Sequence, residues 1–391
     1  MAGKIPVSNP KANYLAHKEE IDEAIARVLD SGWYVGGEEV ARFEREFARY
    51  LGVKHVVAVG SGTDALAITL RALEIGPSDE VIMPSWTCTP TAAAVALVGA
   101  KPVFVDIVED AQTMNPAAIE EVVTKNTKAV IPVQLYVTAA DMDAIMDVAS
   151  YYSLHVVEDA CQAHGAFSNW LAVGTIGIAG CFSFYPTKNL SALGDGGAIA
   201  TNNDRLAEEL RMIRNYGWDD ERSAHRICGQ SRLDPIQAAV LRVKLKYLGD
   251  ENERRIEIAR HYSDVISTIA AHGFAGLRWP RNVPSRDIYV FHQYVVRVPN
   301  RDDVRAALKA DGIETAIHYP VPVHKQPAYA NYDSWFLPIT NQQAGTVMSI
   351  PMYPELTDSE VEFVAEHLKK AIENAIETYN KEQTFYHPVR W

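Results

Sequence analysis

Short apolar runs alternate with helical patterns from about residue 38 to residue 250. The apolar runs predict strands over His55–Val59, Glu80–Pro84, Lys101–Asp106, Ala129–Val133, His155–Glu158, Cys181–Tyr185 and Ala198–Thr201. Apolar residues at helical spacing predict helices over Asp64–Leu73, Thr91–Leu97, Asp141–Tyr152 and Asp204–Arg214. Strands that alternate with helices are typical of βαβ units, so we expect an α/β fold with a mainly parallel sheet.

The pattern changes after a helix that is predicted over Pro235–Leu248. Beyond it the sequence predicts a charged helix, a proline-rich stretch near 280–284, a strand and two more helices: Glu251–Ala270, Tyr289–Val298, Arg301–Asp311 and Asp358–Tyr379. We therefore predict a large domain over residues 1–245 and a smaller α+β domain over residues 246–391. The tail Asn380–Trp391 shows no periodicity, and we expect it to be either a docked arm or disordered.

Composition narrows the class of protein. The chain has 391 residues, of which 48% are hydrophobic and 22% charged, and its formal net charge is -13. This acidic balance argues against partners such as nucleic acid or an anionic membrane surface. No apolar run is long enough to span a membrane, and the four cysteines lie far apart without a CxxC pair. We expect a cytoplasmic protein with reduced thiols and no metal site.

The residues that follow predicted strands are the candidates for chemistry, because ligands bind at the carboxyl ends of strands in sheets of this kind. Asp159 ends one apolar run, and Lys188 follows another. A buried carboxylate can keep a pyridine nitrogen protonated, and a lysine whose pKa is lowered by burial can form a Schiff base. The pair predicts chemistry with pyridoxal 5'-phosphate (PLP), although a lone aspartate is more often a cap and a lone lysine more often a solvated loop charge.

A candidate phosphate site lies in the segment Gly60-Ser61-Gly62-Thr63-Asp64, which follows a predicted strand and opens a helix. The free N–H groups and positive end of such a helix can bind a phosphate. In isolation this is a common strand-to-helix turn. The phosphate-binding interpretation is supported only by its occurrence together with Lys188 and Asp159. The hydroxyl of Ser183 can donate to the same phosphate.

These segments carry a resemblance to a known family. The matching motifs are Ser31-Gly32-Trp33-Tyr34, Gly62-Thr63-Asp64-Ala65-Leu66, Glu158-Asp159-Ala160-Cys161-Gln162-Ala163-His164-Gly165-Ala166, Ser183-Phe184-Tyr185-Pro186-Thr187-Lys188-Asn189, Arg214-Asn215-Tyr216-Gly217, Ser231-Arg232-Leu233-Asp234, Gln237-Ala238-Ala239 and His318-Tyr319-Pro320. In their order and spacing, from about Tyr14 to Leu368, the chain resembles the sugar-nucleotide aminotransferases of the DegT family. That family has the three-layer αβα fold of PLP-dependent transferases, with a mainly parallel sheet and a smaller α+β C-terminal domain.

The resemblance implies roles for individual residues. Lys188 would form the imine with PLP and move the proton, and Asp159 would hold the ring nitrogen. Gln162 would approach the ring hydroxyl. The phosphate would be bound by Ser183 and by the turn that contains Gly62, Thr63 and Asp64. Lys188 also favours transamination over dehydration, because family members that dehydrate the sugar carry histidine at this position.

Substrate contacts are implied less directly. The segments that contain His164 and His318 line the sugar-nucleotide site in the family, although each histidine is equally well explained as a core or loop residue. Tyr185 and Tyr319 are candidates for contacting the sugar or its diphosphate, because a phenol offers apolar area and a donor.

The chain departs from the family pattern at several positions. Cys88 stands where members have an aromatic residue that stacks on the cofactor ring, and Trp86 is the candidate to compensate. Gln230 stands where family members usually have an asparagine that reaches the phosphate of the cofactor in the partner subunit. The segment Leu135-Tyr136-Val137-Thr138-Ala139 and Ser191 also differ from the pattern.

The function implied is a PLP-dependent transfer of an amino group, with L-glutamate as donor and a nucleotide-linked keto-deoxy sugar as acceptor. The contexts Ser31-Gly32-Trp33-Tyr34 and Asp141-Met142-Asp143 favour carbon 3 over carbon 4 as the site of amination. The alternatives are an aminotransferase for a keto-cyclitol, a PLP-dependent dehydratase or lyase, and a non-catalytic regulator. A homodimer is expected, since Gln230 would reach the cofactor of the other subunit.

Overall fold

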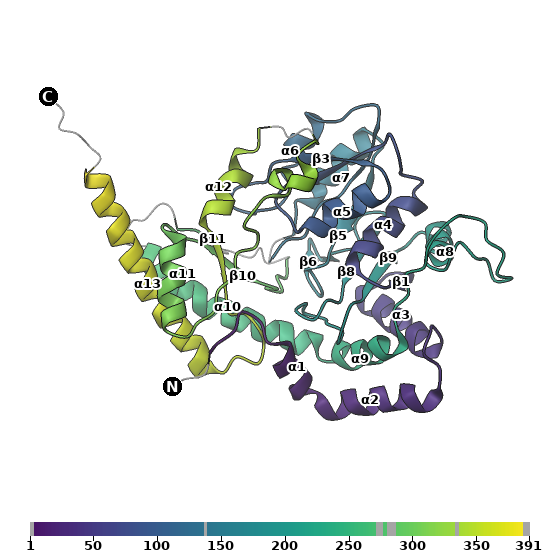
Figure 1. Ribbon diagram of the computed structural model, residues 1–391, viewed down its shortest axis with the longest axis horizontal. Helices are drawn as coiled ribbons and strands as arrows, with labels where there is room; N and C mark the ends of the chain where they lie inside the picture. The colour runs from purple at the N-terminus through teal and green to yellow at the C-terminus, as the bar shows by residue number, and fades with distance from the viewer. Residues whose placement is uncertain (1–3, 137–138, 271–276, 280–286, 333–335, 386–391) are drawn as a thin grey trace.

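The computed structural model describes residues 4–136, 139–270, 277–279, 287–332 and 336–385 (Figure 1). Its helices in the first part of the chain are α1 (Pro10–Ala16), α2 (Lys18–Ser31), α3 (Glu38–Leu51), α4 (Gly62–Ala72), α5 (Thr89–Leu97), α6 (Ala117–Glu120), α7 (Met142–Tyr151), α8 (Asp204–Ile213) and α9 (Pro235–Leu245). The strands there are β1 (His55–Val59), β2 (Glu80–Pro84), β3 (Lys101–Val105), β4 (Thr127–Val130), β5 (His155–Asp159), β6 (Phe167–Ser168), β7 (Leu171–Ala172), β8 (Ala179–Ser183) and β9 (Gly197–Thr201). The later elements are α10 (Leu248–Ala270), β10 (Tyr294–Arg297), α11 (Arg301–Ala310), two short 3-10 helices (Val323–Lys325 and Pro327–Tyr329), α12 (Pro338–Thr346), β11 (Val347–Ile350) and α13 (Asp358–Phe385).

A seven-stranded sheet has the order β1-β9-β8-β5-β4-β2-β3. Neighbouring strands are parallel except at β9, which pairs antiparallel with both β1 and β8. The mainly parallel sheet is therefore confirmed, and β9 is its one reversed strand among the described residues. The carboxyl ends of β1, β2, β5 and β8 consequently meet at one edge of the sheet.

Helices cover both faces of this sheet. In β1, Val57 and Val59 face a core shared with α4, α5 and α8, whereas Val56 and Ala58 face a core shared with α3 and α9. Further along the sheet, α7 covers the second face over β4 and β5. Successive side chains of a strand point to opposite faces of the sheet. Because apolar residues occupy both sets of positions, each face needs a covering layer of helices. The architecture is the expected three-layer αβα fold.

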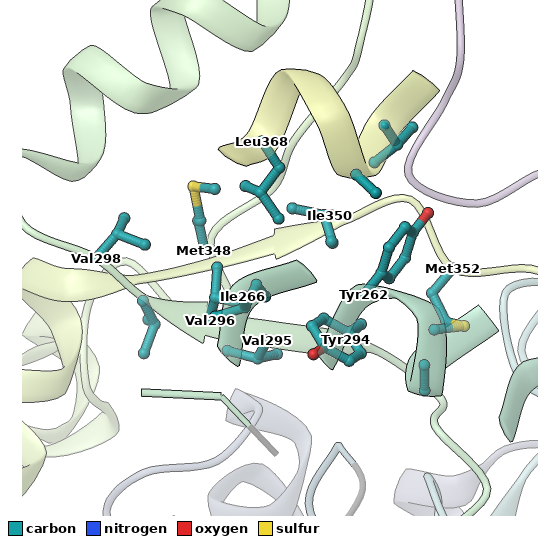
Figure 2. Close-up of a cluster of buried hydrophobic side chains, with 14 of the residues drawn as sticks. Tyr262, Ile266, Tyr294, Val295, Val296, Val298, Met348, Ile350, Met352 and Leu368 are labelled. Atoms are coloured by element: carbon teal, nitrogen blue, oxygen red, sulfur yellow. The ribbon is translucent and has the colours of Figure 1, made fainter. Parts of the chain in front are cut away.

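The last part of the chain builds a further hydrophobic cluster around the antiparallel strands β10 and β11, which α10, α11 and α13 cover and which Trp86 and Tyr136 also join. Figure 2 shows its centre, where Tyr262 and Ile266 of α10 face β10, and Leu368 of α13 faces Met348 and Ile350 of β11. In Figure 1 these elements lie to the left of the large sheet. The N-terminal segment joins them, because Ile5 exchanges backbone hydrogen bonds with Gly312 and Glu314 at 3.0 and 2.9 Å. The division at residues 245 and 246 stays a prediction.

Several predicted boundaries differ from those observed. The predicted strand Tyr289–Val298 is shorter, since only Tyr294–Arg297 pairs with β11. We expected the tail Asn380–Trp391 to be a docked arm or disordered, whereas α13 continues through its first residues to Phe385. The predicted proline-rich stretch near 280–284 lies outside the described residues. Among those described, no helix is both long and apolar enough to cross a bilayer, and they contain no cluster of His, Cys, Asp or Glu suited to a metal ion.

Candidate active site

Asp159 lies at the carboxyl end of β5 and is buried. Its Oδ2 accepts a hydrogen bond of 2.8 Å from Thr91 Oγ1, and its Oδ1 accepts one of 3.2 Å from the Cys161 backbone N–H. Thr91 sits in the first turn of α5, and its own hydroxyl lies 3.0 Å from that of Thr87. The single hydroxyl hydrogen of Thr91 is donated to Asp159, so Thr87 is the donor in the bond between the two threonines. Thr91 lies in no sequence motif and was not among the predicted site residues.

Lys188 lies in the turn that follows β8, where its backbone N–H donates to the carbonyl of Tyr185 at 2.8 Å. The side chain is half-buried. Burial lowers the pKa of Lys188 from its ordinary value, and Cys161, Cys88 and Asp159 offset part of that effect. The environment thus enlarges the share of the neutral amine, which is the nucleophilic form.

The start of α4 lies very close to the end of β8. A Cβ placed on Gly62 would lie 2.7 Å from Ser183 Cβ and 2.9 Å from Cys161 Sγ, so only glycine fits there. Ser61 caps α4 by accepting from the N–H of Asp64 at 3.1 Å. The N–H groups of Gly62 and Thr63, at the first turn of the helix, have no partner in the described part of the chain. They can bind a phosphate beside the Ser183 hydroxyl.

The side chain of Asp64 does not take part in this anion site. Its carboxylate accepts a hydrogen bond of 2.8 Å from the Ser231 hydroxyl, which in turn accepts from the N–H of Gly60. These bonds fasten the strand-to-helix turn to the segment that follows Gln230. Both the carboxylate and the N–H of Asp64 thus have partners, and its part in phosphate binding stays a prediction.

Gln162 links two segments that were predicted separately. Its Oε1 accepts from the backbone N–H of Tyr136 at 2.9 Å, and its Nε2 donates to the Tyr319 hydroxyl at 3.0 Å. Tyr319 also contacts the thiol of Cys88, whose pKa is raised by burial. One amide hydrogen of Gln162 remains for a ligand. Its approach to the ring hydroxyl of PLP stays a prediction.

The two predicted substrate histidines have different environments. His164 is fully buried between the rings of Phe182 and Phe184, and neither ring nitrogen has a hydrogen-bond partner of standard geometry among the described residues. Burial lowers the pKa of His164 to about 3. This favours the core histidine that the sequence left open. His318 is half-buried, bonds Ser349 Oγ through Nδ1 at 2.8 Å, and has its pKa lowered by burial to about 4.

Three predicted residues differ sharply in exposure. Tyr185 is 52% exposed, and Gln230 is exposed as well, with its backbone bridged to Asn215. Trp86 was the candidate to replace the missing stacking ring, but it is only 1% exposed and packs in the cluster that contains Tyr136. Trp86 therefore presents no open face.

Residues outside the predicted set complete the surroundings. Glu158, next to Asp159, is buried and accepts from the N–H groups of Gly174, Ile176 and Gly177 and from Gln134 Nε2, at 2.7 to 3.1 Å. Burial raises the pKa of Glu158, and these four hydrogen bonds counteract the effect. They fasten the end of β5, and with it Asp159. Asn189, which follows Lys188, is buried and contacts Val290, Asn252 and His292. The sequence motif that contains Asn189 does not reveal these contacts, and His292 lies in no motif.

The donor set fits PLP. An anion cradle between α4 and Ser183, a buried carboxylate and a lysine of lowered pKa lie at one edge of the sheet, which is what the phosphate, the ring nitrogen and the aldehyde require. In the described residues, the cradle contains no lysine or arginine, so phosphate binding relies on the helix N-terminus and hydroxyl donors.

Comparisons with known proteins show the family to which the chain belongs. The dTDP-3-amino-3,4,6-trideoxy-alpha-D-glucose transaminase of Streptomyces venezuelae is 46% identical over 355 residues, covering 90% of this chain and 92% of the relative. A structure of S. venezuelae DesV in complex with a ketimine intermediate superposes with a TM-score of 0.91 at 43% identity, covering 95% of this chain and 99% of that chain. Bacillus subtilis NtdA with bound cofactor PMP gives a TM-score of 0.87 at 31% identity, covering 95% and 86%. A family model matches residues 16–369, and the chain belongs to the DegT/DnrJ/EryC1/StrS aminotransferase family.

Proposed function

We propose that this protein is a PLP-dependent aminotransferase that moves an amino group from L-glutamate to a keto group of a nucleotide-linked keto-deoxy sugar, at carbon 3. The observation that supports it best is the convergence of Lys188, Asp159 and the Gly62–Ser183 cradle at one sheet edge. The name of the Streptomyces venezuelae relative, a 3-amino sugar transaminase, supports both the class of acceptor and the preference for carbon 3.

PLP, when bound, supplies a ring that accepts electrons and stores the amino group between the two half-reactions. Asp159, held by Thr91 and the Cys161 N–H, keeps the ring nitrogen protonated. With PLP bound, the amine of Lys188 would accept the proton of the donor's carbon at Nζ and would donate it to the carbon that derives from the carbonyl group of PLP. Burial lowers the pKa of Lys188, which enlarges the share of the neutral amine that can act as the base.

The residues around this centre divide between orientation and recognition. The N–H groups of Gly62 and Thr63 and the Ser183 hydroxyl bind the phosphate, which fixes the cofactor relative to Lys188. His318 stays neutral at physiological pH, because burial lowers its pKa to about 4, and it can bond a sugar hydroxyl. Tyr185 and Tyr319 are placed to contact the sugar or its diphosphate.

We further propose that the functional unit is a homodimer in which Gln230 reaches the phosphate of the partner's cofactor. The support is that Gln230 is exposed and its side chain makes no hydrogen bond among the described residues of its own subunit. A glutamine carboxamide offers the same donor as asparagine with one more methylene of reach.

The first test is a titration of the PLP-loaded protein with L-glutamate while the visible absorbance is recorded. We expect the visible band to disappear as the cofactor takes the amine, and to return when a nucleotide-linked 3-keto sugar is added. A keto-cyclitol that restored the band instead would support the aminocyclitol alternative. A band that never responds to any amino donor would contradict the proposal, and Lys188→Ala serves as the control that should show no such response.

A further inference from the structure

Ser191 is one of the positions at which the chain departs from the family pattern, and the proposed function gives it no role. It is buried, with only 3% of its surface exposed. Its Oγ accepts a hydrogen bond of 3.0 Å from Nζ of Lys244, which is only 2% exposed. Water does not compete freely for a bond between two buried groups. The bond therefore joins the segment that contains Lys188 firmly to helix α9.

Lys244 lies in the last turn of α9, and the hydroxyl of Ser191 is its hydrogen-bond partner among the described residues. Glu251 and Glu355 are the carboxylates that act on its charge, and both accept from Asn13 Nδ2, at 2.9 and 3.0 Å. Burial lowers the pKa of Lys244 to about 8, and the two carboxylates offset part of that effect. The amine is therefore mostly protonated at neutral pH, and the hydroxyl replaces part of its lost hydration.

The segment Tyr185–Ser191, the Lys188 turn, follows strand β8. A backbone hydrogen bond of 2.8 Å from the N–H of Ala192 to the carbonyl of Phe184 closes this turn. Its first four residues are exposed or half-buried, whereas its last three are buried. Ser191 directly precedes the closing bond and lies three residues after Lys188. The buried end of the turn thus limits where the backbone of Lys188 can lie.

One face of α9 holds this buried end. Gln237, Leu241 and Lys244 are spaced i, i+4, i+7, so they lie on one side of the helix. Gln237 Oε1 accepts from the N–H of Leu193 at 2.8 Å, and its Nε2 donates to the carbonyl of Leu193 at 3.3 Å. Leu241 belongs to the same buried cluster as Leu190. Lys244 adds a bond to a side chain of the turn itself, at its buried end.

We propose that Ser191 and Lys244 are positioning residues for Lys188: the hydrogen bond from Lys244 Nζ to Ser191 Oγ anchors the end of the Lys188 turn on α9. This inference rests on the proposed function, in which Lys188 reacts with the cofactor. Neither Ser191 nor Lys244 transfers a proton in this role. Their bond holds the backbone from which the Lys188 side chain extends.

Three substitutions separate this role from a contribution to stability alone. Lys244→Met removes the donor without leaving a buried charge, so the urea midpoint of unfolding should not fall. Ser191→Ala removes the acceptor and leaves the buried ammonium unpaired, so its urea midpoint should fall. Lys246→Met is the matched control, because Lys246 is exposed and bonds Glu20 of α2 rather than the turn.

The first measurement is amide hydrogen exchange of the full chain without PLP, followed by mass spectrometry on the peptide that contains residues 185–193. The loss of one hydrogen bond from a charged donor shifts a local opening equilibrium by about 10-fold or more. We expect this peptide to exchange about 10-fold faster in Lys244→Met and at the unsubstituted rate in Lys246→Met. Unchanged exchange in Lys244→Met would overturn the anchor.

The second measurement is the rate at which the visible band forms at saturating PLP, which requires the Lys188 amine to reach the bound cofactor. A displaced reacting group slows a step that depends on proximity. We expect the rate to fall about 10-fold in Lys244→Met and in Ser191→Ala, with no further fall in the double variant. An unchanged rate in Lys244→Met, or falls that multiply in the double variant, would overturn the positioning role.

Two features keep the outcomes separate. If Ser191→Ala does not fold, Lys244→Met and Lys246→Met still decide the question, because neither leaves an unpaired buried charge. Unsubstituted protein that formed no visible band with PLP would count against the proposed function. Hydrogen exchange needs no PLP, so it would still test the anchor in that case.

Discussion

Replacing Thr91 by valine removes one hydroxyl from the site and keeps the shape of the side chain. Thr91 and Asp159 are both buried, and the hydroxyl donates to the carboxylate over 2.8 Å. In the variant, Asp159 loses this donor and keeps its contacts with Cys161. Thr87 loses its acceptor as well. The interaction of the Asp159 carboxylate with the ring nitrogen of PLP should therefore weaken.

The size of the effect follows from the type of bond. A hydrogen bond to a charged group contributes about 1.5 to 3 kcal/mol net. Every 1.4 kcal/mol corresponds to a factor of ten in an equilibrium constant, so Thr91→Val should raise the Kd for PLP by about 10- to 150-fold if the full loss falls on binding. Any part of this free-energy loss that weakens binding of the transition state rather than of PLP would lower kcat instead.

The assay is a PLP titration followed by absorbance, together with steady-state rates at saturating PLP. Thr89→Val is the matched control, because Thr89 lies on the same helix but bonds Gln326 rather than Asp159. The control should keep the Kd and kcat of the unsubstituted protein. If Thr91→Val also kept both values, Thr91 would not support Asp159 and the reasoning would be refuted.

Three further predictions concern the cradle, the subunit interface and stability. Gly62→Ala should release PLP on dialysis, since its Cβ would lie 2.7 Å from Ser183 Cβ, whereas Gly249→Ala, with open space around the Cβ, should retain it; equal retention would contradict the cradle. Gln230→Ala should weaken PLP retention at limiting PLP while light scattering still reports a dimer, and unchanged retention would remove the cross-subunit role. The folded-state pKa of His164, about 3, lies below its ordinary 6.5, so the unfolded chain gains a proton first as pH falls through 6.5, and the free energy of unfolding should drop by about 2 kcal/mol at pH 5 from this group. Urea unfolding of His164→Leu should show a smaller drop between pH 7.5 and 5 than the unsubstituted protein, and an equal drop would argue that His164 is not buried neutral.

The strands of the large sheet were predictable because each is an apolar run between polar turns. Observed and predicted ends differ by a few residues: β4 begins at Thr127, two residues before the predicted start. The strand ends at Val130, although the apolar run continues beyond it and Ile131 and Val133 still pair with β2 and β5. The reversed direction of β9 had no signal in the sequence, since a buried strand reads the same in either direction.

The site was predictable where chemistry coincides with strand ends, as at Asp159, Lys188 and Gly62. Its supporting contacts were not, because they join positions far apart in the chain: Thr91 and Asp159 are 68 residues apart, Asn189 and His292 are 103, and Gln162 and Tyr319 are 157. No local spacing reports such pairs. Trp86 shows the same limit, since its position two residues from Cys88 says nothing about the side to which its ring turns.

The central claim is that Lys188 carries the cofactor. The most direct measurement is to reduce the PLP-loaded protein with borohydride, digest it and locate the pyridoxyl group by mass spectrometry. The account predicts the label on the peptide that contains Lys188 and its absence from Lys188→Ala. A label on another lysine, or a protein that loads with PLP but retains no label after reduction, would contradict it.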